Sequence, residues 1–204
     1  MSTSNKENYK VLVLGQAKTG KTSIIKRFIN NEFKEEYTPT NNIDFSIINV
    51  EIKEPNNVTV SDYANNNTEK KTKSIQMCFW DVAGSNEENK FNNVYYKDAD
   101  VAIIVFDVSS DKSFSSITTW LRDLRNNTEK NIPIFVIGNK IDLTHYNVDP
   151  LVEYCKNNNI NEGFSLISAL KNKGVTSTMH HIIDMMTNIN SDTPKSHNIS
   201  MTCD

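Results

Sequence analysis

The pattern Gly-x-x-x-x-Gly-Lys-Thr at residues 15–22 constrains this chain more than any other feature of its sequence. It follows an apolar run from Tyr9 to Leu14 that predicts a buried strand, and it opens a stretch from Lys21 to Asn31 that predicts a helix. Glycines in such a loop let successive backbone N–H groups face a phosphate chain, and the helix N-terminus adds its dipole. The Lys21 ammonium would lie against the β- and γ-phosphates as a positive point charge, and the Thr22 hydroxyl would ligate Mg²⁺. The pattern therefore predicts a site for the phosphates of a nucleotide.

Strand-like and helix-like stretches alternate along the rest of the chain. Uninterrupted apolar runs from Val101 to Phe106 and from Ile132 to Ile137 suit central strands of a parallel sheet that is covered on both faces. The segments Phe45 to Ile52 and Ile75 to Trp80 alternate more, as a hairpin with one wetter face would. Helices are predicted at 21–31, 113–125, 150–157 and 174–188. We expect an α/β fold, with helices on both faces of a mostly parallel sheet.

Composition excludes several classes of protein. Lys and Arg number 22 against 25 Asp and Glu, so no basic excess exists to neutralise the phosphates of a nucleic acid. Mean hydropathy is −0.52, and no apolar run approaches the roughly 18 residues of a membrane span. The three cysteines are too scattered for a disulfide framework or a zinc site, and the N-terminus lacks the apolar core of a signal peptide. We expect a soluble, cytoplasmic protein.

The chain divides into one domain with polar additions. Residues 1–8 form an N-terminal extension, residues 9–188 form the domain, and residues 189–204 form a polar tail that we expect to be disordered. Residues 54–74 are rich in Asn and Lys and fall inside the predicted hairpin. We expect them to be a flexible insertion without a direct catalytic role.

A second motif, Asp81-Val82-Ala83-Gly84, follows the predicted strand that ends at Trp80. A carboxylate at a strand end can hold Mg²⁺ through water, which is the role expected of Asp81. Gly84, with no side chain, would allow its backbone to approach a γ-phosphate closely. In isolation the motif is also compatible with an ordinary turn after a strand.

A third motif, Asn139-Lys140-Ile141-Asp142, follows the apolar strand that ends at Ile137. The Asp142 carboxylate can accept hydrogen bonds from both N1–H and the 2-amino group of guanine. Adenine has no 2-amino group and its N1 is an acceptor, so it would leave the carboxylate unpaired. Lys140 can lay its stem against the base and ribose. After a phosphate loop at this spacing, the motif predicts a guanine site.

These three motifs in this order resemble the Ras-like small GTPases over residues 9–188, apart from the insertion. Residues 37–45, which end in Asp-Phe, resemble the first switch of the Rab branch. Trp80-Asp81 followed by residues 94–97 resembles its second switch. The resemblance implies a six-stranded sheet with five helices, bound GTP or GDP with Mg²⁺, and a monomeric GTP-dependent switch in vesicle traffic. It also implies effector proteins, an exchange factor and a GAP as partners, and a place in the cytoplasm or on the cytosolic face of endomembranes.

The resemblance also assigns roles to individual residues. Thr40 would ligate Mg²⁺ and sense the γ-phosphate, Phe33 would pack across guanine, and the Ala169 N–H would meet guanine O6. Phe45, Trp80 and Tyr95 would form an aromatic triad that effectors contact. Core packing of Phe33 and Tyr95, and a plain loop hydroxyl at Thr40, are the alternatives. Nucleotide contacts are expected from Gly15, Gln16, Ala17, Lys18, Thr19, Gly20, Lys21, Thr22, Ser23, Phe33, Asn139, Lys140, Asp142, Ser168, Ala169 and Leu170. Hydrolysis is expected to involve Lys21, Thr40, Gly84 and Ser85.

The chain departs from the family at the residue after Gly84, where the family usually has Gln and this sequence has Ser85. That Gln orients the attacking water, and phosphoryl transfer depends on positioning and charge stabilisation. Ser is too short to span the same contacts, so we expect slow intrinsic hydrolysis. A GAP could compensate, because the resemblance implies a Rab-type GAP that supplies both an Arg and a Gln side chain. The alternative function is a guanine-nucleotide-binding scaffold with little or no hydrolysis.

Other departures carry smaller expectations. Lys18, inside the phosphate loop, is expected to point to solvent, and Asn42 replaces a first-switch glycine but tolerates positive φ. Leu170 replaces a Lys and would loosen the packing of the base. The tail has the single Cys203, so one prenyl chain would give weak, reversible membrane binding, the alternative being an unmodified cysteine. A P-loop enzyme of another class, such as a nucleoside kinase, lacks support, because no arginine-rich lid follows in this sequence and residues 139–142 would have no purpose in such an enzyme.

Overall fold

The computed structural model describes residues 7–53, 72–84, 93–128, 131–189 and 201–202. Several expectations fall outside these residues: those on residues 1–6 of the extension, residues 54–71 of the insertion and residues 190–200 of the tail, the role of Ser85, and the lipid state of Cys203. The remaining motifs all lie in the described part of the chain.

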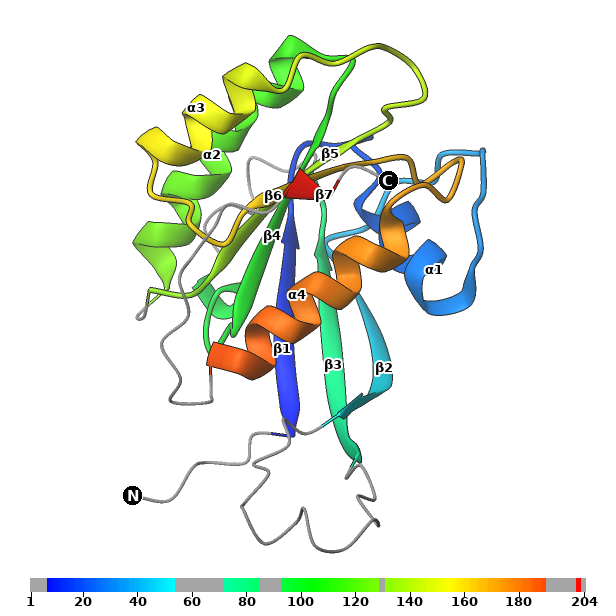
Figure 1. Cartoon of the computed structure of the whole chain (residues 1–204), viewed down its shortest axis with the longest axis vertical. Helices are drawn as coiled ribbons and strands as arrows, with labels where there is room; N and C mark the ends of the chain where they lie inside the picture. Colours follow the sequence, from blue (N-terminus) through cyan, green and yellow to red (C-terminus); the bar gives the residue numbers. More distant parts are fainter. Residues whose placement is uncertain (1–6, 54–71, 85–92, 129–130, 190–200, 203–204) are drawn as a thin grey trace, which may run out of the picture.

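One twisted sheet of seven strands runs through the molecule (Figure 1). Its order is β2-β3-β1-β4-β5-β6-β7, and every neighbouring pair is parallel except β2 with β3. The strands are β1 (Asn8–Leu14), β2 (Ile43–Lys53), β3 (Thr72–Val82), β4 (Val101–Asp107), β5 (Ile134–Asn139), β6 (Phe164–Ile167) and β7 (Met201–Thr202).

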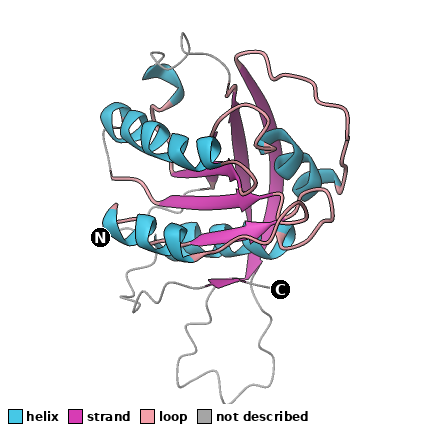
Figure 2. Cartoon of the chain, turned by 90° about the horizontal axis from the view of Figure 1, so that it is seen from above, coloured by secondary structure: helices cyan, strands magenta, loops and turns pink. Residues whose placement is uncertain are grey.

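Helices cover both faces of this sheet (Figure 2). The helices of the described residues are α1 (Lys21–Asn30), α2 (Asp111–Asn127), α3 (Asp149–Asn157) and α4 (Val175–Ile189), with a 3-10 turn η3 (Asn93–Tyr95). Side chains of α1 and α4 share one apolar core with the sheet, and those of α2 and α3 share the other. The α/β fold of a P-loop small GTPase, predicted from the sequence, is confirmed.

The two cores explain the uninterrupted apolar runs. In β4, Ile103 and Val105 face the core beneath α1 and α4, whereas Ile104 and Phe106 face the core beneath α2 and α3. All of these side chains are buried. Because alternate residues of a strand point to opposite faces, a strand covered on both sides must be apolar at every position.

Helix α2 shows how local signals fix one of these layers. Ser110 caps its N-terminus by accepting a hydrogen bond from the Ser113 N–H. Its buried stripe contains Ile117, Trp120 and Leu124, at the three- and four-residue spacing that predicted a core-facing helix.

The structure differs from the sequence-based expectation at several boundaries. Residues 72–74, assigned to the insertion, belong to β3 and pair with residues 51–53 of β2, and Asn8, assigned to the extension, belongs to β1. Pairing with a neighbour extends these strands beyond the apolar pattern. The expected six strands are β1 to β6; β7 is a seventh, inside the tail expected to be disordered, and pairs with β6. No described helix has the length and apolar character needed to cross a membrane.

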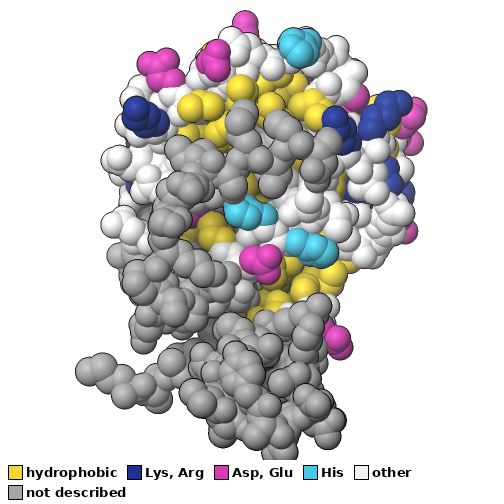
Figure 3. Space-filling model, viewed as in Figure 1, with side chains coloured by type: hydrophobic (Ala, Val, Ile, Leu, Met, Phe, Trp, Pro, Cys, Tyr) yellow, Lys and Arg dark blue, Asp and Glu magenta, His cyan; other side chains and the backbone are white. Residues whose placement is uncertain are grey.

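On the face that α4 covers, histidine and acidic side chains lie at the surface among apolar ones (Figure 3). His180 and His181 belong to α4, where His180 is exposed and His181 is half-buried. Each packs edge-on or tilted against a phenylalanine, Phe28 and Phe135 respectively.

Candidate nucleotide-binding site

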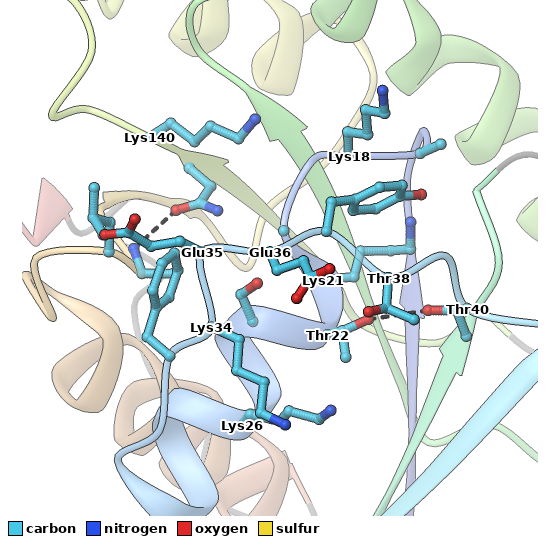
Figure 4. A pocket seen from close by; sticks show the side chains of 18 of the residues that line it. Lys18, Lys21, Thr22, Lys26, Lys34, Glu35, Glu36, Thr38, Thr40 and Lys140 are labelled. Atoms are coloured by element: carbon cyan, nitrogen blue, oxygen red, sulfur yellow. Dashed lines mark hydrogen bonds between the residues drawn. The ribbon is translucent and has the colours of Figure 1, made fainter.

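A cavity of about 420 Å³ opens at the carboxyl edge of the sheet (Figure 4). It lies above β1 and its neighbours, where the chain turns toward β2 and β3 on one side and β4 on the other. Such a switch point is where open α/β sheets bind ligands. Its walls come from the phosphate loop, the segment 32–40, Gly84, residues 139–143 and residues 169–170.

The phosphate loop curls because its backbone takes left-handed conformations. Gly20, which precedes α1, has φ 93°, and a Cβ there would lie 2.3 Å from the side-chain nitrogen of Asn139. Glycine is therefore the residue that this position accepts. Lys18 also has a positive φ, 67°, and its side chain is exposed, as the sequence predicted. Its Nζ lies 5.4 Å from the ring centroid of Tyr37, which belongs to the opposite wall of the cavity.

Lys21 is buried at the base of the loop, with only 6% of its surface exposed. Its Nζ donates hydrogen bonds to the carbonyl oxygens of Gly15 (2.8 Å) and Gln16 (3.0 Å). Burial lowers the pKa of Lys21 to about 8, although the Asp81 carboxylate acts in the opposite direction. A phosphate in the cavity would supply the negative charge that this ammonium lacks.

Thr22, Thr40 and Asp81 come from three separate segments and converge on one point; the side chains of Thr22 and Thr40 are drawn in Figure 4. The Thr22 hydroxyl donates to Asp81 Oδ2, and the Thr40 Oγ1 lies 3.1 Å from Thr22 Oγ1 and 3.5 Å from Asp81 Oδ2. The Thr40 hydroxyl therefore lies beside a hydroxyl of α1 and the carboxylate of the second motif.

The chemistry of this point fits a hard cation. Asp81 is buried, its Oδ1 has no hydrogen-bond partner within the described residues, and burial raises its pKa. Magnesium prefers oxygen ligands and retains several from water or phosphate, so one carboxylate with two hydroxyls is a suitable protein contribution. No group of three or more His, Cys, Asp or Glu in the described chain offers a competing metal site.

Gly84 lies directly on the phosphate loop. Its carbonyl accepts a hydrogen bond from the Ala17 N–H (3.2 Å), and a Cβ at this position would lie 2.3 Å from the Ala17 nitrogen. The Gly84 backbone thus approaches the phosphate loop closely, and its approach to a γ-phosphate stays a prediction.

Asn139 joins the phosphate loop to the far end of the cavity. Its buried side chain donates to the Thr19 carbonyl (2.9 Å) and accepts from the Ala169 N–H (3.0 Å). The amide that the family resemblance assigns to guanine O6 is thus already engaged by Asn139. The two loops that would hold opposite ends of a nucleotide share one amide side chain.

The charged residues of the third motif are each held by a partner. Asp142 lines the cavity and accepts a hydrogen bond from the Ser168 hydroxyl. Lys140 pairs with Asp107 at 2.6 Å, at the end of β4. Burial would raise the pKa of Asp107, but hydrogen bonds from Lys140 and Ser109 outweigh it and lower that pKa. Sequence reasoning missed Asp107, although its position at the end of a central strand was a usable signal.

At the base end, Leu170 and Phe33 were predicted to contact the nucleotide, whereas Leu143 was not singled out from the sequence. Leu143, 61% exposed, and Leu170, 37% exposed, are apolar side chains that line the cavity. Phe33 is half-buried, lines the same end, and lies 5.5 Å from the guanidinium carbon of Arg27. Arg27 was not singled out from the sequence.

Two members of the expected aromatic triad, Phe45 and Trp80, are in direct ring contact. The rings of Phe45 and Trp80 meet edge to face at 4.6 Å on β2 and β3, and Phe45 is 50% exposed. Lys10 Nζ lies 3.5 Å from the Trp80 ring centroid. Tyr95, in η3, is half-buried and packs on the same core as Trp80. Asn42, just before β2, has φ 57°, the positive value predicted for it.

Comparison with known proteins agrees with this geometry. Residues 10–188 match the family model described as the Ras family. The chain belongs to the Ras family. It is 31% identical over 189 residues to the Ras-related protein Rab-32A of Dictyostelium discoideum, covering 88% of this chain and 78% of that protein. It is also 31% identical over 194 residues to the Ras-related protein Rab-1 of Theileria parva, covering 92% and 80%.

A third relative is considerably longer than this chain. Ras-related protein Rab-32B of Dictyostelium discoideum is 32% identical over 183 residues, which cover 87% of this chain but 64% of that protein. The chain therefore spans slightly less than two thirds of Rab-32B. Together the three relatives place this Ras-family chain in the Rab branch of the small GTPases.

Proposed function

We propose that this Rab-branch protein is a GTP- and GDP-binding switch of intracellular membrane traffic that hydrolyses GTP slowly. The observation that carries the proposal is a cavity with three kinds of chemistry in it or directly beside it. The buried Lys21 lies at the phosphate loop, and the Asp142 carboxylate lines the far end. The hydroxyls of Thr22 and Thr40 lie beside the Asp81 carboxylate, whose Oδ1 has no hydrogen-bond partner among the described residues. This sequence of groups matches the phosphates, the metal and the base of a guanine nucleotide.

At the phosphate end, Thr22, Thr40 and Asp81 would hold Mg²⁺, which when bound neutralises charge on the β- and γ-phosphates. Lys21 and the backbone amides of the loop bind the phosphate oxygens. Asp142 selects guanine, because with adenine its carboxylate would lose the two donors, N1–H and the 2-amino group, that guanine supplies in addition to the Ser168 hydroxyl. Asn139 keeps the phosphate loop and the 168–170 loop at a fixed separation.

Switching would involve Thr40 and Gly84, since these residues bring two different segments to the phosphate end. A γ-phosphate would order both segments, and its loss would release them. Phe45 lies five residues after Thr40, and Trp80 directly precedes Asp81. The two rings are in contact, so a change at the metal would be passed to this aromatic surface. Effector proteins would contact that surface, and an exchange factor and a GAP would act on the same segments.

Hydrolysis is proposed to be slow because Ser85 follows Gly84 where the family usually has Gln. The test is single-turnover hydrolysis of bound GTP by the natural protein and by Ser85→Gln. We expect the Gln variant to be faster by about tenfold or more, since a longer amide can orient the water. Equal rates in the two proteins would refute the slow-hydrolysis proposal. A rate near zero in both would favour the second candidate, a guanine-nucleotide-binding scaffold.

Base selection is tested separately by competition of GTP, GDP and ATP for the purified protein. Asp142→Ala should lose at least about a hundredfold of the guanine preference, because the site would no longer pair N1–H and the 2-amino group. Asp149→Ala is the matched control, since Asp149 is an exposed carboxylate at the start of α3. Competition by ATP as strong as that by GTP in the natural protein would favour a P-loop enzyme of another class.

Membrane association through Cys203 is proposed to be weak, because one prenyl chain without a polybasic segment binds reversibly. The intact mass of protein purified from its native cells would show whether a lipid is attached. An unmodified mass would remove Cys203 from the proposal and leave the nucleotide site unaffected.

A further inference from the structure

Arg27 connects three parts of the base end without lining the cavity itself. It lies in the last turn of α1, and its side chain is half-buried. Its Nε donates to the Ala169 carbonyl at 3.0 Å, and its NH2 lies 3.4 Å from the Leu170 carbonyl. Arg27 is separated from Ala169 by 142 positions in the sequence and from Leu170 by 143. Figure 1 shows α1 beside the chain that leads into α4, which explains how they meet.

The other side of the same guanidinium holds the end of α1. Its NH1 donates to the Asn31 carbonyl at 2.8 Å and lies 3.3 Å from Asn31 Oδ1. Asn31 has φ 56° and ends the helix, with its backbone N–H bonded to the Arg27 carbonyl. Asn172, beyond the base loop, donates to Asn31 Oδ1 at 3.1 Å. The end of α1 and the loop that follows β6 are therefore tied together twice.

Phe33 completes the arrangement. The Arg27 guanidinium carbon lies 5.5 Å from the centroid of its ring, within the range of a cation–π contact. Phe33, Ala169 and Leu170 all line the cavity, whereas Arg27 is not among the residues that line it. One planar group outside the cavity thus contacts both the ring expected to cover the base and the loop expected to meet the base edge.

We propose that Arg27 is a positioning residue for guanine, which sets the separation between the Phe33 ring and the 169–170 loop. This inference rests on the proposed nucleotide function. Arginine suits the role because its planar fork can donate in several directions and stack on a ring at once, whereas the ammonium of lysine is a compact point charge. Lysine at this position would keep the charge near the C-terminus of α1 and lose the fork.

The test compares the full-length protein with Arg27→Lys and Arg27→Gln. Arg122→Ala is the matched control, because the Arg122 side chain is 68% exposed on the remote helix α2. Two quantities are measured at saturating Mg²⁺: the release rate of bound GDP, and the ratio of the affinities for GDP and ADP. If Arg27 served folding alone, its variants would bind GDP and ADP more weakly by the same factor, and the ratio of the two affinities would stay unchanged.

We expect Arg27→Lys to release GDP about tenfold faster and to lower the GDP-to-ADP ratio about tenfold, as for the loss of one charge-assisted hydrogen bond. Arg27→Gln should behave alike or more strongly, and Arg122→Ala should stay within about twofold. Unchanged release and ratio in both Arg27 variants, or equal losses for GDP and ADP, would overturn the positioning role. If the natural protein itself lacked a guanine preference, the proposed function would fail, and this inference with it.

Discussion

Nucleotide affinity should depend on pH through Lys21, and the structure gives the midpoint and the sign. Burial lowers the pKa of Lys21 to about 8. Phosphate oxygens favour the charged amine and raise that pKa in the complex. Binding therefore takes up a proton whenever the free protein has lost one, and affinity must fall as pH rises through about 8.

The size of the effect follows from the protonated fraction of the free protein. With a pKa of about 8, that fraction falls from about nine tenths at about pH 7 to about one tenth at about pH 9. The dissociation constant of GDP should therefore rise about tenfold over this range. Equilibrium titration with a fluorescent GDP analogue at constant Mg²⁺ and ionic strength measures it directly.

Lys21→Arg supplies the control for this experiment, because a guanidinium stays charged throughout the range. Its absolute affinity will differ, so only the slopes are compared, and its slope reports any titration of the nucleotide itself. Parallel curves for the natural protein and the arginine variant would show that the Lys21 amine does not titrate on binding, and the reasoning from its burial would be refuted.

Three further predictions concern the metal point, the second motif and the core. Asp81→Asn should weaken Mg²⁺ by about tenfold or more, seen as a higher Mg²⁺ concentration needed to slow GDP release, because the unpartnered carboxylate oxygen loses its charge; an unchanged requirement would contradict the metal assignment. Gly84→Ala should lower the free energy of unfolding by about 1–3 kcal/mol, since its Cβ would meet the Ala17 nitrogen at 2.3 Å. Denaturant titration without nucleotide measures this change, and an unchanged free energy of unfolding would contradict the prediction by showing that the loop moves aside. Phe135→Ala, at a fully buried ring, should cost about 3–5 kcal/mol by the same titration, with Arg122→Ala as the surface control.

Much of the fold was predictable because its signals are local. The apolar runs of β1, β4 and β5 are written into consecutive residues, and the stripe of α2 follows the helical repeat. Strand ends were less predictable: residues 72–74 are polar and join β3 only because β2 lies alongside them. The four-residue β6 is too short to stand out by pattern, and β7 depends wholly on pairing with β6.

The motifs of the candidate site were likewise visible in the sequence, but their connections were not. The motifs that contain Lys21, Asp81 and Asp142 indicate a guanine-nucleotide site, because each lies at the carboxyl end of one of three strands, β1, β3 and β5, that run parallel in one sheet. Only the folded chain brings Thr40 to Thr22, joins Asn139 to both loops, pairs Lys140 with Asp107 and places Arg27 behind Phe33. These contacts join residues that are mostly far apart in sequence, and the packing of helices on the sheet decides which of them meet. The sequence by itself determined which chemical groups are available, and the tertiary structure decided which of them act together.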